Sequence, residues 1–149
     1  MKADHHTLPP ETLVPKILAL LEVSDAVPLV ITGASMTPFL AHKRDTVFLS
    51  KPNRPLKRGD MIFYRRDCGQ YILHRIHSVD HGCYRLVGDA QTAIEPGIRP
   101  DQVLAIVTAV RRKGKLLRPG MVCWEFFEHC WLRIIPLRPY IFKIHSLFH

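Results

Sequence analysis

A serine, a histidine and two acidic residues follow one another in an order that suits nucleophilic catalysis. Ser35 comes first, His74 follows, and Asp89 and Glu95 come after it. A serine hydroxyl becomes a useful nucleophile when a base accepts its proton and a third group holds that base. The order therefore predicts a hydrolytic serine site, with Asp89 as the orienting acid and Glu95 as the reserve candidate.

Ser35 occupies a turn of small residues. Gly33 and Ala34 precede it and leave room for backbone N–H groups to face a developing oxyanion. Met36 follows and is expected to pack beneath the turn and lock it. The alternative is an ordinary loop serine that bonds its own backbone.

His74 lies within an alternating segment, residues 71–79. Alternation puts it on the same face as Ile72 and Ile76. A histidine on an apolar face needs a hydrogen-bond partner, and Ser35 together with a carboxylate would supply two. The alternative is a core histidine satisfied by a backbone carbonyl. For Asp89, the alternative is an aspartate that begins a turn.

Short strands separated by turn residues must position these side chains. The expected strands are residues 28–32, 46–50, 61–64, 71–79, 83–87 and 103–110, with another short strand after Lys113–Lys115. Residues 71–79 and 83–87 flank Asp80-His81-Gly82 and read as a hairpin. A short helix ending near Glu22 precedes the strands. The fold class is therefore mainly β.

Beyond Gly120 the pattern changes to helical spacing. The apolar residues that recur there are Trp124, Phe127, Trp131, Ile134, Ile135, Ile141, Ile144 and Phe148. Cations lie among them, and Pro136 and Pro139 interrupt the run. The pattern fits a helix packed over the β-structure or into a partner protein, and it also fits an interfacial membrane segment.

Composition limits the class of protein further. A chain of 149 residues with 47% hydrophobic and 23% charged residues predicts one folded protein. Its net charge of +8 is spread over separate segments without a recognition motif, so no nucleic-acid partner is expected. The four cysteines fit no metal pattern and are expected as free thiols, and no metal or cofactor is predicted. A signal peptide and a membrane span are not expected either.

Four segments in order resemble the S24/S26 serine peptidase superfamily, which includes signal peptidase I and the LexA-type repressors. They are Gly33–Leu40, Arg58–Tyr64, Leu73–Ile76 and Leu86–Ala90. The His-Arg-Ile motif resembles the archaeal and endoplasmic-reticulum-type branch, in which histidine rather than lysine is the base.

The resemblance implies a role for each candidate residue. Ser35 would be the nucleophile, His74 the general base and Asp89 its orienting acid, while Glu95 stands where a second aspartate is more usual. Gly33 replaces a residue that supplies a hydroxyl in some relatives, so the oxyanion donors would be backbone groups, the Ser35 N–H among them. The implied fold is a small coiled, barrel-like all-β structure that binds its substrate as an added strand.

Three parts are expected on this basis. Residues 1–27 form an N-terminal extension with a short helix, residues 28–118 the β peptidase domain, and residues 119–149 an amphipathic aromatic tail.

The leading prediction is a serine endopeptidase that cleaves an extended precursor or leader peptide, in the cytoplasm or peripherally on the inner face of the membrane. Its partners would be a peptide or protein substrate and, through the tail, a membrane surface. One alternative is a non-catalytic module that binds a peptide or a membrane surface on the same scaffold. The other is a LexA-like self-cleaving protein.

Overall fold

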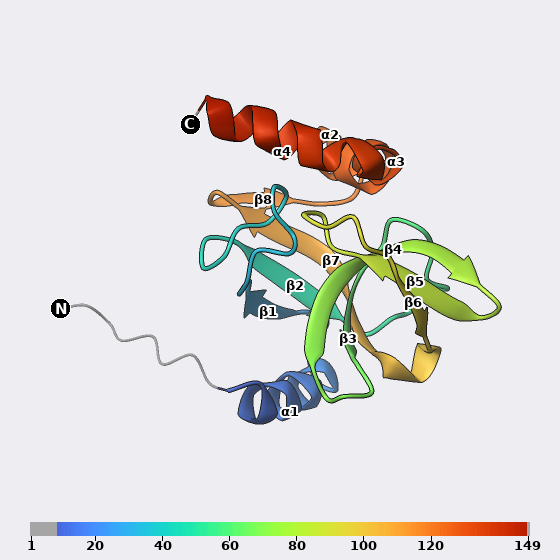
Figure 1. The fold of residues 1–149 in the computed structure, drawn as a ribbon. Helices are drawn as coiled ribbons and strands as arrows, with labels where there is room; N and C mark the ends of the chain where they lie inside the picture. The colour runs from blue at the N-terminus through green and yellow to red at the C-terminus, as the bar shows by residue number, and fades with distance from the viewer. Residues whose placement is uncertain (1–8, 149) are drawn as a thin grey trace.

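One antiparallel sheet forms the centre of the protein (Figure 1). The computed structural model describes residues 9–148. The strands are β1 (Val27–Val30), β2 (Thr46–Ser50), β3 (Met61–Arg65), β4 (Tyr71–Asp80), β5 (Cys83–Val87), β6 (Glu95–Ile98), β7 (Val103–Arg112) and β8 (Lys115–Leu117). Their order across the sheet is β1-β2-β7-β3-β4-β5-β6, and β8 pairs with the end of β7.

Most of the strands agree with the sequence-based expectations. The β4–β5 hairpin is confirmed, with Arg75 opposite Val87 and Asp80 opposite Cys83. Strand β6 was not predicted, because its sequence Glu-Pro-Gly-Ile carries two residues that disfavour strands. It forms at the outer edge of the sheet, where a missing N–H is tolerated.

The sheet contributes to separate hydrophobic clusters on its two sides. Strand β3 shows this most clearly, since its first four residues are all buried. Met61 and Phe63 join the main core, whereas Ile62 and Tyr64 join a second cluster. Register shifts interrupt the β2–β7, β3–β7, β4–β5 and β5–β6 pairings. Such bulges bend strands and increase their twist, which suits a sheet with core on both sides.

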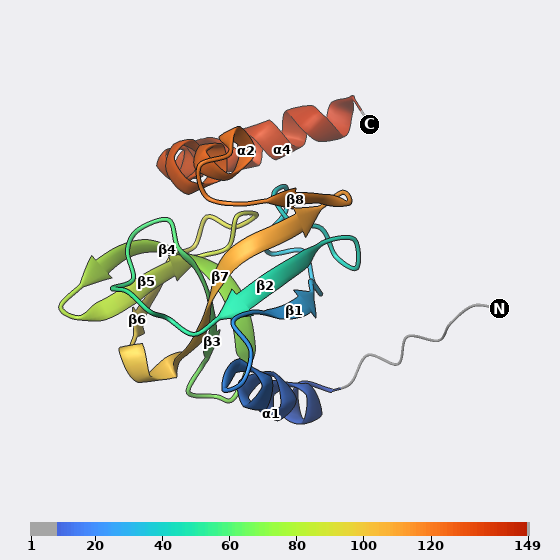
Figure 2. The same ribbon diagram turned by 180° about the vertical axis from the view of Figure 1, so that it is seen from behind.

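Helices lie at opposite ends of the sheet (Figures 1 and 2). At one end is α1 (Pro10–Leu21), which buries Val14, Ile17 and Leu21. At the other end are the C-terminal helices, in the order α2 (Val122–Glu125), a π-helical turn (Phe126–Cys130), α3 (Trp131–Arg133), a 3₁₀ turn (Ile135–Leu137) and α4 (Arg138–Leu147). One more 3₁₀ turn, Pro100–Gln102, precedes β7.

The first half of the C-terminal region packs into the main core. Trp124, Phe127 and Trp131 are buried there. The Phe39 ring, from the loop between β1 and β2, meets Phe127 at 4.7 Å and Trp124 at 6.1 Å between ring centroids. These helices therefore hold the loop that carries Ser35, as expected for a helix packed over the β-structure.

Candidate active site

The loop between β1 and β2 is fixed at both of its ends. The Ile31 amide donates to the Asp45 carbonyl over 2.9 Å, and the Lys43 amide donates to the Ile31 carbonyl over 2.7 Å. Met36 is buried beneath the turn, as predicted, and Phe39 and Leu40 are fully buried beside it. A loop anchored in this way holds Ser35 in one place.

Gly33 lets the backbone turn just before Ser35. Its φ of 87° lies in the region that glycine adopts without strain. Its amide donates a hydrogen bond to His42 Nδ1 over 2.7 Å. Within residues 9–148, the next three amides, those of Ala34, Ser35 and Met36, donate to no protein acceptor. They remain available to a bound group, as an oxyanion site requires.

The Ser35 turn rests directly on the segment that follows β5. The Ala90 amide donates to the Ser35 carbonyl over 2.9 Å. Gly88 lies so close that a β-carbon there would stand 2.5 Å from the Ser35 carbonyl oxygen. Because Val87 pairs with Arg75, this contact brings the serine turn to the part of the sheet that carries His74.

His74 is buried and faces Tyr64 across the β3–β4 pair. Ile62 lies opposite His74 and Tyr64 opposite Ile72, so all four side chains share one face. The Tyr64 hydroxyl lies 3.4 Å from His74 Nδ1 and donates to Glu95 Oε2 over 2.8 Å. Glu95 also accepts two hydrogen bonds from the Arg66 guanidinium, at 2.8 and 2.9 Å.

This chain of contacts selects one form of the imidazole. Tyr64 has a single hydroxyl proton, and that proton is given to Glu95. The Tyr64 oxygen can therefore only accept from the ring, which places the proton of a neutral His74 on Nδ1. Nε2 is then left with its lone pair, the form that a general base needs.

Electrostatics favour this neutral form. Burial, helped by the positive charge of Arg66, lowers the pKa of His74 to about 4. Burial tends to raise the pKa of Glu95, but hydrogen bonds from Arg66 and Tyr64 outweigh it and the pKa lies below its usual value. Burial and the Glu95 carboxylate raise the pKa of Tyr64. At neutral pH the group is a neutral imidazole, a phenol and a carboxylate.

Asp89 makes a different contact from the one predicted for it. Its carboxylate forms a buried bidentate pair with Arg75, at 2.9 and 3.0 Å. Arg75 also donates to the Gly59 carbonyl and lies over the Phe39 ring. Within the described chain, neither the Asp89 carboxylate nor Ser35 Oγ makes a hydrogen bond to His74. The carboxylate linked to His74, through Tyr64, is that of Glu95.

Tyr64, Arg66 and Arg75 are the residues that sequence reasoning missed. For Tyr64, the alternation of side chains along the strands could have predicted its place. Pairing residues 61–64 with residues 71–76 through the short intervening loop places Tyr64 on the face of His74.

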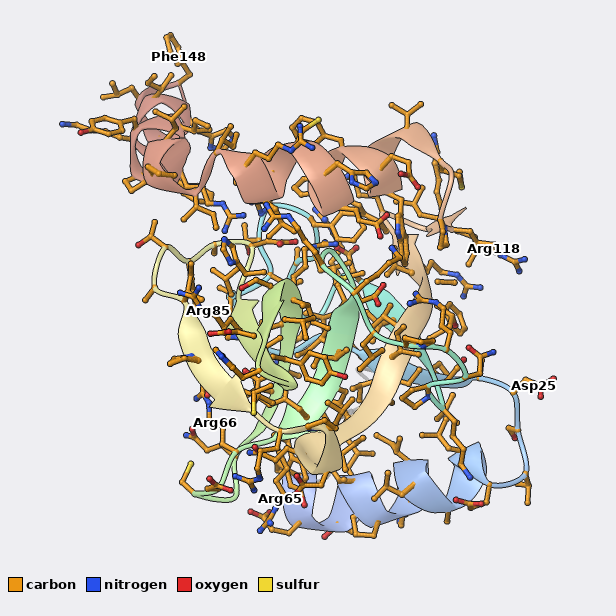
Figure 3. The ribbon with its side chains drawn as sticks, turned by 90° about the vertical axis from the view of Figure 1, so that its right-hand side faces the viewer. Asp25, Arg65, Arg66, Arg85, Arg118 and Phe148 are labelled. Carbon is orange, nitrogen blue, oxygen red and sulfur yellow. The ribbon has the colours of Figure 1, made fainter. Side chains whose placement is uncertain are left out.

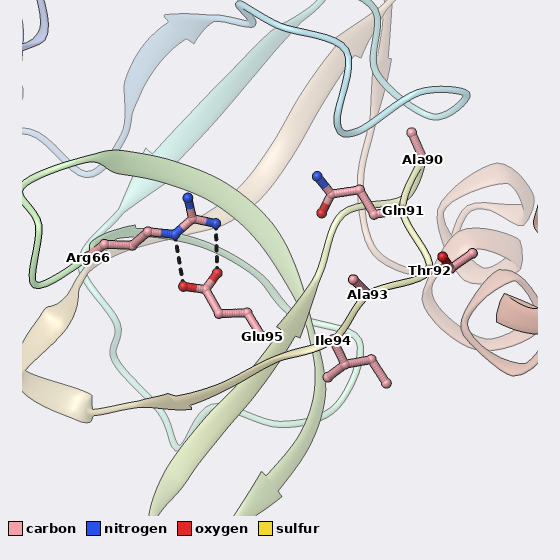
Figure 4. Close-up of a pocket in the computed structure, with 7 residues that line it drawn as sticks. All are labelled: Arg66, Ala90, Gln91, Thr92, Ala93, Ile94 and Glu95. Atoms are coloured by element: carbon pink, nitrogen blue, oxygen red, sulfur yellow. Dashed lines mark hydrogen bonds and ion pairs between the residues drawn. The ribbon is translucent and has the colours of Figure 1, made fainter.

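A shallow pocket of about 510 Å³ lies beside these groups. The segment from Ala90 to Glu95 lines it, together with Arg66. Figure 4 shows the Arg66–Glu95 pair at one side of the pocket and Ala90 at the other. Ser35 and His74 do not line the pocket themselves, but two of its lining residues contact their surroundings, Ala90 through the Ser35 carbonyl and Glu95 through the Tyr64 hydroxyl.

The C-terminal helices brace the pocket from behind. Arg138 donates to the carbonyls of Gly88, Gln91 and Trp131 at 2.8 to 3.0 Å. The Trp131 indole N–H donates to the Asp89 carbonyl over 2.7 Å. The segment that faces Ser35 is thus held by both the sheet and the helices.

Away from this site, one group of potential metal ligands is found among residues 9–148. Carboxylate or ring atoms of Glu125, Glu128 and His129 lie within 4.8 Å of one another on the C-terminal helices. Glu128 already pairs with Lys57 at 3.0 Å, and His129 with Glu125 at 3.0 Å. These contacts account for the cluster without an ion.

Comparisons with protein-family models, with curated proteins and with solved structures found no match to this chain. In the described part of the chain, every helix is too short or too polar to cross a membrane.

Proposed function

We propose that the chain is a serine endopeptidase of the signal-peptidase-like type, with Ser35 as nucleophile and His74 as general base. The observation that carries the proposal is the contact between the Ser35 turn and the Gly88–Ala90 segment. This contact joins the Ser35 turn to the Leu86–Ala90 motif, and the Val87–Arg75 pairing sets that motif beside Leu73–Ile76. No one of these motifs would specify a hydrolase alone. The bent antiparallel sheet also suits the S24/S26 superfamily that these motifs resemble.

The proposed reaction begins with the neutral imidazole. His74 Nε2 accepts the Ser35 hydroxyl proton as Oγ attacks the peptide carbonyl, and the free Ser35 amide stabilises the oxyanion. His74 then gives the proton to the leaving amine, which breaks the peptide bond and leaves an acyl-enzyme. Water, deprotonated by the same Nε2, releases the acyl group and regenerates Ser35.

In this proposal Glu95 takes the role of the orienting acid. The imidazolium formed during each step keeps its Nδ1–H on Tyr64, and the Glu95 carboxylate lies behind that hydroxyl. Asp89 then acts through structure, because its pair with Arg75 fixes the segment on which Ser35 rests. The Ser35–His74 hydrogen bond would form on substrate binding, as catalytic contacts often tighten only in the complex.

The substrate we propose is an extended peptide or protein segment. Among residues 9–148, strand β6 is the last strand, at one edge of the sheet, and the pocket lined by Ala90–Glu95 reaches its first residue. A peptide added to such an edge is held by main-chain hydrogen bonds, while side-chain pockets set its specificity. Small residues before the cut are what the family resemblance implies. We place the reaction in the cytoplasm, with peripheral contact to the inner face of the membrane.

The test is cleavage of a peptide mixture, read by mass spectrometry. We expect new termini with the wild-type chain and none with Ser35→Ala or His74→Ala. The matched controls are Ser24→Ala and His81→Ala, which change exposed residues and should keep full activity. Equal cleavage by the Ser35→Ala and wild-type chains would overturn the proposal.

A second function, a peptide-binding module without chemistry, is favoured by one observation. Ser35 Oγ and His74 share no hydrogen bond within residues 9–148. In that case the wild-type and Ser35→Ala chains would bind the same peptides with equal affinity, and neither would cleave them.

A further inference from the structure

The outward face of α4 is apolar and exposed. The side chains on this face are Leu137, which immediately precedes the helix, and Tyr140, Ile141, Ile144 and Leu147. They recur at three- and four-residue spacing, so they form one continuous stripe along the helix. Tyr140 is 67% exposed, Ile144 56% and Leu147 74%. The side chain of Phe148 extends this end of the molecule away from the sheet (Figure 3).

The fold does not need this stripe, because α4 is attached by its other face. Arg138 is fully buried and donates hydrogen bonds to the Gly88 and Gln91 carbonyls and to the Trp131 carbonyl of α3. Phe142 packs edge-on against Trp131, with ring centroids 6.1 Å apart. The apolar stripe is therefore displayed on a helix that is already held in place, and its exposure points to a partner.

Charge indicates the kind of partner. Residues 129–148 contain no aspartate or glutamate. The exposed cations of this region, Arg133 and Lys143, come from α3 and α4. The whole chain carries a net charge of +8. A second copy of the chain would bring an equally cationic helix against this one, whereas an anionic lipid surface accepts both the apolar stripe and its flanking cations.

We propose that α4 docks the protein on an anionic membrane surface. Ile144 and Leu147 enter the boundary between headgroups and acyl chains, and Lys143 and Arg133 contact the lipid phosphates. The helix lies at the same end of the sheet as the loop that carries Ser35 (Figure 1), so docking brings that loop close to the membrane. Docking itself does not depend on the proposed peptidase chemistry.

The test is flotation of the purified full-length chain with vesicles of equimolar phosphatidylcholine and phosphatidylglycerol. We expect the chain to float with these vesicles and to stay behind with phosphatidylcholine alone. Ile144→Glu and Leu147→Glu should each weaken binding about tenfold, because each removes apolar burial at the interface. Lys143→Gln should weaken it about fivefold, the share of one cation near an anionic surface.

Two controls separate docking from loss of fold and from catalysis. Val79→Glu changes another exposed apolar residue, in the β4–β5 hairpin, and should bind vesicles as the wild type does. Ser35→Ala should also bind normally, whether or not the chain is a peptidase. Circular dichroism checks that each variant is folded.

Failure of the wild type to float, or normal flotation of both α4 glutamate variants, would overturn the proposal. So would concentration-dependent self-association that Ile144→Glu abolishes in a chain that does not bind vesicles.

Discussion

The main-chain amide of Ala90 donates a hydrogen bond to the main-chain carbonyl of Ser35 over 2.9 Å. This single bond ties the loop after β1 to the segment after β5. Gly88 permits the approach because it has no side chain, and Arg138 and Trp131 brace the segment from behind. The surroundings of the candidate nucleophile therefore depend on contacts from the sheet, a loop and the C-terminal helices together.

Gly88→Ala tests this approach. The new β-carbon would meet the Ser35 carbonyl oxygen at 2.5 Å, and a backbone atom cannot move aside as a flexible side chain can. We expect a loss of about 1–3 kcal/mol in the free energy of unfolding, together with reduced peptide cleavage. Urea denaturation measures the first quantity. Adding Gln91→Ala removes the other close contact and should not restore stability, because the clash with Ser35 remains.

Tyr64→Phe tests the relay between His74 and Glu95. The substitution keeps the buried ring and removes the hydroxyl that joins the two side chains. Without it the imidazole loses the contact that selects its tautomer. We expect kcat to fall about tenfold to a hundredfold, a part of what a general base contributes, with KM nearly unchanged. Steady-state kinetics against pH would check this, and an unchanged kcat and pH profile would rule the relay out.

Asp89→Asn and Glu95→Gln distinguish the two acids. Removing the Asp89 charge leaves Arg75 buried without its partner, so unfolding should become easier by about 3–5 kcal/mol. Glu95 is half-buried, and its loss should act mainly on kcat rather than on stability. Denaturation and kinetics of both variants give the comparison. The reverse pattern would return the orienting role to Asp89.

Stability should fall in mild acid because of His74. Burial lowers its pKa to about 4 in the folded protein, against about 6.5 in an unfolded chain. Between these values the unfolded state binds more protons, so stability is fully present above about pH 6.5 and decreases as the pH falls toward 4. The decrease is on the order of 3 kcal/mol.

Urea denaturation across this pH window would measure the decrease. His74→Gln should flatten the pH dependence. Burial also lowers the pKa of His77, so His77→Gln measures the smaller share of that residue. His81→Gln, at an exposed position, serves as the control. An equally steep dependence in His74→Gln would exclude His74 as its source.

Local patterns in the sequence were enough to predict the turn that carries Ser35 and every strand except β6. The short apolar run of β2, the alternation in β4 and the Asp-His-Gly turn of the hairpin involve only a few neighbouring residues, so the sequence alone predicts them. The small residues around Ser35 also specify their turn locally. Strand β6 was not predicted, because it forms through its pairing with β5 in spite of the weak strand propensity of its own residues.

Contacts between distant segments were decided by the tertiary structure alone. Asp89 and Glu95 are both acidic residues that come soon after β5. Asp89 nevertheless pairs with Arg75, whereas Glu95 accepts from Tyr64 and Arg66. Which carboxylate approaches His74 depends on strand register and on the path of the 90–95 loop, and neither follows from spacing. The same holds for the C-terminal region, where helical periodicity predicted helices and only packing showed which apolar residues are buried. Trp131 enters the core and Ile144 remains outside because Arg138 and Phe142 fix the inner face of α4.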